Sequence, residues 1–237
     1  PLEHKVIDGV NTQLYRMENI PVSAGNFTFN SFVNNQNYIF DVVNADFNAT
    51  KNGFVERTPD PQARFHIIYR NDGNGNSSAN TGFFLMFKQG SLQRADVLLN
   101  EPQENRTIPI DVPNINETDV WVQSVNDSGN VVSQGYWSRV GNVPTDNLVK
   151  ISLSTDNISY NNVDPEVQNI FQVVTQEDDK ISVRFGDGRF GKIPTGNIRV
   201  WYRVSANQNL TIRPEDIQNV QITIPYSTRE LTQKRLT

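Results

Sequence analysis

KISVRFGDGRFGKIPTGNIRVWYRV, residues 180–204, is the stretch that decides the fold of this chain. Its glycines at positions 186, 188 and 191 have the spacing of the dinucleotide-binding fingerprint, and a lysine, Lys192, follows directly. That fingerprint binds a pyrophosphate only where a strand leads into a helix whose N-terminal amides point at the phosphates. The residues on either side of the glycines therefore decide between a nucleotide site and a β-turn.

The flanks favour the β-turn. Residues 180–185 alternate polar and apolar side chains, as a half-buried strand does. Residues 193–197 form a second turn, and residues 198–204 are rich in β-forming side chains without a helical period. A Walker-type phosphate loop is excluded as well, because Ile193 stands where that motif has Ser or Thr. We expect no phosphate site here.

We interpret the glycine segment as a structural connection between two strands. Residues 186–188 make a tight turn, and Asp187 accepts hydrogen bonds from nearby backbone amides. Phe190 is expected to return to the core, and residues 196–197 to reverse the chain into the next strand.

The remaining pattern is that of a turn-rich β protein. About thirty asparagines disfavour helices and populate turns. Short apolar and aromatic runs predict strands at residues 27–32, 38–43, 65–69 and 83–87, and residues 120–140 predict a hairpin. Helix is expected only at residues 164–171 and 213–216.

The polar loop at residues 70–82 invites a calcium interpretation that its spacing does not sustain. Asp72, Asn74 and Asn76 occupy the first three ligand positions of an EF-hand loop. Ser77 and Phe83, however, replace the required glycine and the bidentate glutamate. Since hard cations need several charged oxygens, we expect no metal site.

Composition excludes several classes of function. The chain has no cysteine, which removes disulfides and thiolate chemistry and fits folding in a reducing cytoplasm. A net charge of -5 gives no basic footprint for nucleic acid, and no apolar run is long enough to cross a bilayer. The chain begins without methionine, which indicates processing or a longer polypeptide. We expect neither a nucleic-acid partner nor a membrane.

Catalytic constellations are also missing from the sequence. Its two histidines, His4 and His66, do not suffice for a triad or a facial metal site. The consecutive carboxylates at residues 177–179 indicate a solvated turn, because two catalytic carboxylates flank a substrate from different elements. We expect no enzyme activity and no cofactor.

One resemblance adds to this reading. Residues 169–225 contain FGDG-x-x-G-x-x-P-x-G followed by Tyr-Arg-x-Ser, and this resembles the signature of baseplate wedge proteins from contractile-tailed bacteriophages. The resemblance implies an assembly motif with no catalytic role. Its residues in this chain are Phe185, Gly186, Asp187, Gly188, Gly191, Pro194, Gly196, Tyr202 and Arg203.

The sequence thus predicts a mainly β protein of two sandwich-like modules with little helix, residues 1–118 and residues 119–237, the second ending in a polar tail or arm. The resemblance implies a structural subunit of the virion tail, made in the bacterial cytoplasm. Its expected partners are other copies of itself, other wedge subunits, and tail tube or sheath proteins. The alternatives are a glycan-binding module that uses Trp121 or Trp137, and a hydrolase that uses Asp178 or Asp187.

Overall fold

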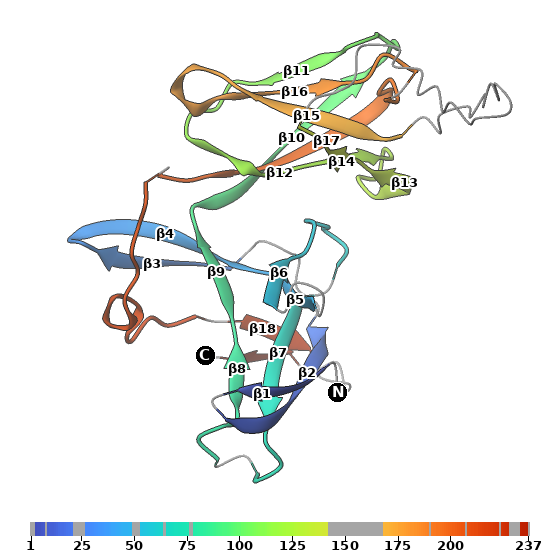
Figure 1. The fold of residues 1–237 in the computed structure, drawn as a ribbon. Helices are drawn as coiled ribbons and strands as arrows, with labels where there is room; N and C mark the ends of the chain where they lie inside the picture. Colours follow the sequence, from blue (N-terminus) through green and yellow to red (C-terminus); the bar gives the residue numbers. More distant parts are fainter. Residues whose placement is uncertain are drawn as a thin grey trace, which may run out of the picture. The chain divides into compact units, whose positions relative to one another are not determined.

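The fold was determined as a computed structural model, which describes residues 3–7, 9–20, 27–48, 53–63, 65–75, 78–141, 168–189, 191–206, 208–222, 224–227 and 233–236. Strands dominate these residues, and the helical elements among them are two short 3-10 turns. The predicted fold class, mainly β with little helix, is confirmed. Figure 1 shows the ribbon and the labels used below.

The chain divides into two compact units. Unit 1 combines residues 1–92 with residues 205–237, and unit 2 is the continuous segment of residues 93–204. The boundary expected between residues 118 and 119 lies inside a strand, Ile115–Val125, so the division differs from that expectation. The physical reason is strand pairing. The strand Ile115–Val125 pairs with the strand Gly196–Val204 in one antiparallel ladder, and a domain boundary at residue 118 would divide that ladder.

Unit 2 is a sandwich of two four-stranded sheets (Figure 1). The first sheet has the order β10-β17-β12-β13 and the second the order β11-β16-β15-β14. The strands are β10 (Ser91–Leu99), β11 (Thr107–Ile110), β12 (Ile115–Val125), β13 (Val131–Tyr136), β14 (Ser138–Arg139), β15 (Ile170–Thr175), β16 (Ile181–Phe185) and β17 (Gly196–Val204). The predicted hairpin is β12–β13, and the predicted strands around the glycines are β16 and β17.

Alternation along the strands places the apolar side chains of unit 2 between its two sheets. One core cluster draws on six of the eight strands and includes Ile108, Val122, Phe171, Val183 and Val200. The turn between β15 and β16 is the 3-10 element η1 (Glu177–Asp179), whose three carboxylates are exposed, as the sequence predicted.

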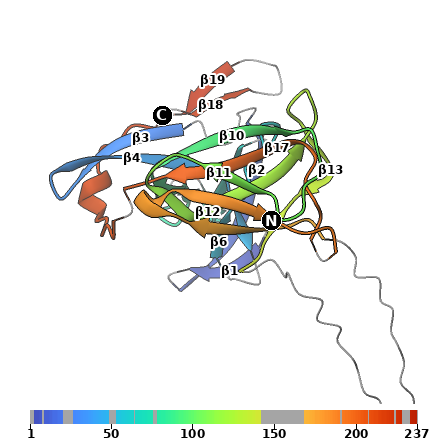
Figure 2. The same cartoon turned by 90° about the horizontal axis from the view of Figure 1, so that it is seen from above.

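Unit 1 contains sheets of four, three and two strands and a C-terminal hairpin. Their orders are β1-β2-β7-β8, β3-β4-β9 and β5-β6. The hairpin is β18-β19, which Figure 2 shows. The strands are β1 (Glu3–Ile7), β2 (Val10–Ile20), β3 (Phe27–Val33), β4 (Gln36–Val43), β5 (Ala45–Asn48), β6 (Gly53–Glu56), β7 (Phe65–Asn71), β8 (Gly82–Phe84), β9 (Met86–Gln89), β18 (Ile224–Ser227) and β19 (Gln233–Leu236).

The core of unit 1 joins segments that are distant in the sequence. Phe29, Phe40 and Phe65 belong to a buried cluster from β3, β4 and β7, and side chains of residues 206–222 pack against it. The backbone N–H of Ala206 donates to Gln89 Oε1 at 2.8 Å, and Tyr38 Oη donates to Gln208 Oε1 at 3.1 Å. This return of the chain after β17 explains why unit 1 is discontinuous.

Three local expectations have a different outcome. The run at residues 83–87 is two strands, because the chain leaves β8 at Leu85 and β9 joins another sheet. Of the helix expected at residues 164–171, residues 164–167 lie outside the described part, while Ile170 and Phe171 begin β15 because they pair with β14. Within the polar C-terminal tail, residues 233–236 form β19, paired with β18.

The second expected helix is present as a 3-10 turn, η2 (Pro214–Ile217), within unit 1. None of the helical elements in the described part of the chain is long and apolar enough to span a membrane.

Candidate functional site

The glycine segment between β16 and β17 is a turn in which two stretches of backbone touch. A Cβ added at Gly186 would lie 2.3 Å from the carbonyl oxygen of Gly191, and one added at Gly191 would lie 2.9 Å from Ile170 Cγ1. The Gly188 N–H donates to the same Gly191 carbonyl at 2.8 Å. Only glycine tolerates so close an approach, so the spacing serves packing between backbones.

Hydrogen bonds hold this turn from both sides. Asp187 Oδ1 accepts the backbone N–H of Arg189 at 2.9 Å, which confirms the predicted role of Asp187 as a turn former. The Gly186 carbonyl accepts Asn105 N–H at 3.0 Å, and Lys192 N–H donates to the Gln168 carbonyl at 2.9 Å. The expected inward position of Phe190 lies outside the described residues.

The nucleotide interpretation fails on the structure as it did on the sequence. Residues 191–195, all within the described part, contain no helical turn. The next element is β17, whose first residue, Gly196, has a positive φ of 75°. No helix N-terminus is therefore presented to a phosphate at Gly191.

The other motif residues are parts of the unit 2 interior. Phe185 is fully buried and meets Trp137 edge to face, with ring centroids 4.9 Å apart. Pro194 is buried, and Tyr202 lies in the core, where burial raises the pKa of its hydroxyl. Arg203 forms a buried ion pair with Asp119, so the motif does not gather into one pocket.

A buried polar row on β17 was not predicted from the sequence. Arg199, Trp201 and Arg203 alternate with the core residues of that strand, and all three are buried. Arg199 Nε donates to Asp96 Oδ1 at 2.7 Å, and its Nη1 donates to the Gly129 carbonyl at 2.8 Å. The sequence does contain a signal for this row. Arg199 and Arg203 each lie two positions from Trp201 in an otherwise apolar strand, and this spacing could have predicted it.

The tryptophans of the glycan alternative do not form a surface site. Trp137 is only 8% exposed, and its Nε1 donates to Ser124 Oγ at 2.9 Å. Trp121 is half-buried and pairs in register with Trp201 across β12 and β17. Trp201 Nε1 in turn donates to Gln123 Oε1 at 2.9 Å. The three indoles therefore take part in the internal contacts of the unit 2 sandwich.

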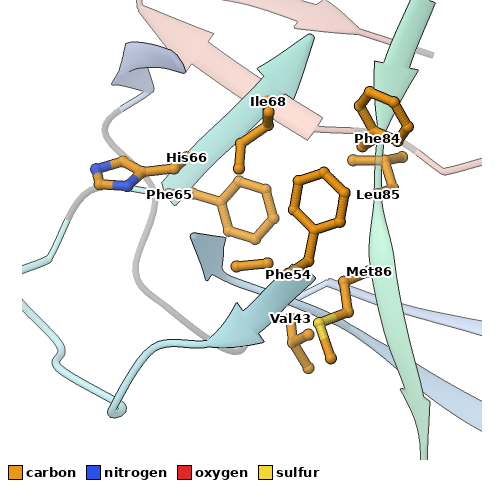
Figure 3. Close-up of a pocket in the computed structure, with 9 residues that line it drawn as sticks. Val43, Phe54, Phe65, His66, Ile68, Phe84, Leu85 and Met86 are labelled. Atoms are coloured by element: carbon orange, nitrogen blue, oxygen red, sulfur yellow. The ribbon is translucent and has the colours of Figure 1, made fainter. Parts of the chain in front are cut away.

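Unit 1 contains an apolar cavity of about 340 Å³ (Figure 3). Its walls include Val43, Phe54, Phe65, Ile68, Phe84 and Met86. The His66 ring points away from this cluster in Figure 3, and its Nδ1 lies 2.8 Å from Arg57 Nη1. The cavity therefore offers apolar contact and no catalytic group.

A second, polar cavity of about 280 Å³ lies on the sheet β1-β2-β7-β8. It is lined by His4, Asn11, Gln13, Tyr15, Asn71, Asp72 and Gly73. Asp72 Oδ2 accepts Ser78 Oγ at 2.5 Å and its Oδ1 accepts Asn74 N–H at 2.9 Å, and these hydrogen bonds lower the pKa of the carboxyl to about 2. Asp72, the one carboxylate of the loop at residues 70–82, thus forms its hydrogen bonds within that loop.

In the described residues, no side chains are grouped for metal binding or acid–base chemistry. No cluster of three or more His, Asp or Glu side chains there is placed to hold a metal ion. The exposed carboxylates of η1 lie in one turn, and Asp187 is hydrogen-bonded within another turn. None of these carboxylates is among the described residues that line the two cavities above.

Comparison with known proteins places the chain in a family. A family model described as a domain of unknown function, DUF8360, matches residues 1–237. No curated protein and no solved structure matches the chain. Because the model spans the whole sequence printed here, the chain belongs to the DUF8360 family.

Proposed function

We propose that this chain is a structural subunit of a bacteriophage tail baseplate, a wedge component that assembles into a ring around the tail tube. In this role it contacts further copies of itself, other baseplate subunits and the sheath. The observation that carries the proposal is the FGDG-x-x-G-x-x-P-x-G segment, which resembles the wedge signature and is built as a tightly packed corner between β16 and β17.

The construction of that corner supports an assembly role. Its glycines bring two backbone stretches into contact. Its flanks are hydrogen-bonded to Asn105 and Arg106, just before β11, and to Gln168, just before β15. A corner held in this way is rigid, and rigid elements transmit force between subunits without rearranging.

The edges of the unit 2 sheets support the proposal as well. β10 and β13 are the outer strands of one sheet, and each carries exposed apolar side chains. Leu98 is 60% exposed on β10, and Val132 and Tyr136 are 39% and 49% exposed on β13. Edge strands with exposed apolar groups are suited to strand pairing and aromatic anchoring between subunits.

The test is to locate the chain in tailed particles. Particles are purified from cells that express the gene, and the chain is detected with an antibody and placed by electron microscopy. We expect a repeated ring at the end of the tail tube. Absence of the chain from particles, or a position at the distal end of a fibre, would overturn the proposal.

A pair of glycine variants links that location to the motif. Gly186→Ala forces a Cβ against Gly191, whereas Gly141→Ala meets no atom within 4 Å in the same unit. We expect the Gly186 variant to lose assembled tails and the Gly141 variant to keep them. Normal tails with the Gly186 variant would separate the motif from assembly.

A further inference from the structure

One face of the sheet β1-β2-β7-β8 collects polar and aromatic side chains by register. In the antiparallel ladders, His4 lies opposite Gln13, Gln13 opposite Asn71, and Tyr15 opposite Tyr69. Directly opposite residues point to the same face, and alternation adds Asn11 on β2. The polar cavity of about 280 Å³ is the hollow in this face.

Asn11 and Asn71 retain hydrogen-bonding capacity in the cavity, whereas the amide oxygen of Gln13 accepts the Tyr15 hydroxyl. Asn71 Oδ1 accepts Gly73 N–H at 2.8 Å, and no other hydrogen bond of this side chain occurs among the described residues. The Asn11 side chain makes none within that same part of the chain. Because an amide donates through nitrogen and accepts through oxygen, these groups match ligand hydroxyls, which do both.

Asp72 adds a fixed acceptor at the rim. Its carboxylate already accepts Ser78 Oγ and Asn74 N–H, which fix its orientation. The side chains of Asn74 and Asn80 also hydrogen-bond this carboxylate, so Asp72 places a fixed negative charge at the rim of the cavity.

Aromatic rings continue the face toward β8. Tyr15 and Tyr69 stack with ring centroids 5.1 Å apart, and Phe83 follows at 6.3 Å from Tyr69 with 58% of its surface exposed. The face of an aromatic ring carries partial negative charge, which attracts the C–H groups of a sugar ring. The stacked tyrosines cover one face of each other, so Phe83 is the exposed ring that offers a sugar this contact beside the amide-lined hollow.

The charges of the cavity exclude other ligand classes. Among the described residues its lining has no lysine or arginine to bind a phosphate, and the one carboxylate among them is too few for a hard cation. Every side chain in the described lining carries a polar group, which an apolar ligand would leave without a hydrogen-bond partner. We propose that this cavity and the adjoining Phe83 ring bind a neutral oligosaccharide, a second activity of unit 1 that does not rest on the proposed role in assembly.

The test is an NMR titration of the full chain with maltotriose, cellotriose and chitotriose. We expect at least one of them to shift the backbone amides of Asn11, Gly73 and Asn74, with a Kd in the millimolar range or tighter. Inorganic phosphate serves as the charged probe and is expected to leave these amides unchanged.

Variants assign the binding to the cavity. Asn11→Ala combined with Gln13→Ala removes two amides and is expected to raise the Kd about tenfold or more, since each hydrogen bond is worth severalfold in affinity. The matched control is Asn30→Ala, an exposed amide on β3 in a different sheet of the same unit. The control is expected to bind as the unchanged chain does.

Three outcomes would overturn the proposal. They are the absence of shifts with all three sugars at about 10 mM, an unchanged Kd in the double variant, and shifts of the same amides by phosphate. Because the titration uses the isolated chain, its failure is distinguishable from a failure of the chain to appear in particles.

Discussion

Arg203 Nε lies 2.9 Å from Asp119 Oδ2, and the two side chains are 1% and 6% exposed. This pair joins β17 to β12 inside unit 2, where an ion without a partner is costly. The arginine of the sequence motif is therefore held by a carboxylate outside it.

Removal of that carboxylate should strongly destabilise unit 2. Asp119→Ala removes the carboxylate that lies beside the buried guanidinium, and we expect the free energy of unfolding to fall by about 3–5 kcal/mol. Urea denaturation followed by tryptophan fluorescence measures this directly, because all three tryptophans, Trp121, Trp137 and Trp201, lie in unit 2. Asp111→Ala is the control, since its carboxylate is 84% exposed although it lies 2.7 Å from Lys180 Nζ. The control should cost less than about 1 kcal/mol, and equal losses for both variants would contradict the prediction.

Truncation of the motif phenylalanine should open a cavity in the same core. Phe185 is fully buried against Trp137, so Phe185→Ala is expected to cost about 3–5 kcal/mol and to change the emission of that indole. Val174→Ala, at a side chain that is 38% exposed on the neighbouring strand β15, should cost less than about 1 kcal/mol in the same denaturation experiment. A loss of similar size at both positions would show that Phe185 is not a core residue.

Unit 2 should fold without the rest of the chain. A fragment of residues 91–204 contains every member of its core cluster, from Leu99 to Tyr202. We expect this fragment to give a cooperative thermal transition and dispersed NMR amide signals. A fragment of residues 119–237 lacks β10 and β11 and the start of β12, and it should remain unfolded. A folded second fragment would contradict the division into units.

The loop after β7 should titrate at unusually low pH. Hydrogen bonds from Ser78 and Asn74 lower the pKa of Asp72 to about 2, and Ser78→Ala should move it back toward 3.8. Since the pKa in the folded state is the lower one, the stabilisation is complete above pH 3.8 and is lost as the pH falls toward 2. NMR titration of the side-chain carboxyl carbon gives both values, and a midpoint near 3.8 in the unchanged chain would refute the assignment.

Local patterns were enough to predict several strands, among them β3, β4 and β7, and the nature of the glycine turn. Alternation defined β16 and β17, because one face of each strand is buried in the sandwich. The hairpin β12–β13 followed from the turn residues between two β-rich runs. The same reasoning made residues 83–87 one strand, since nothing in that run marks the change from one sheet to another at Leu85.

The candidate sites were much less accessible to sequence reasoning. Nothing in the order of residues brings Asn11 on β2 near Asp72 in the loop after β7, so the polar cavity arises only from the pairing of β2 with β7. The partners of Arg199 and Arg203 were hidden for the same reason, because Asp96 and Asp119 are each more than eighty residues distant in sequence.

The sequence by itself determined that the chain is a β protein and that its three-glycine segment is a turn, because side-chain alternation and backbone crowding are local properties. Tertiary structure decided where the units divide and which polar groups meet, since both depend on strand pairing between distant segments. The return of residues 205–222 to unit 1 is the clearest case. Its apolar side chains are scattered along the segment without a strand or helix period, and they pack against the core formed by β3, β4 and β7.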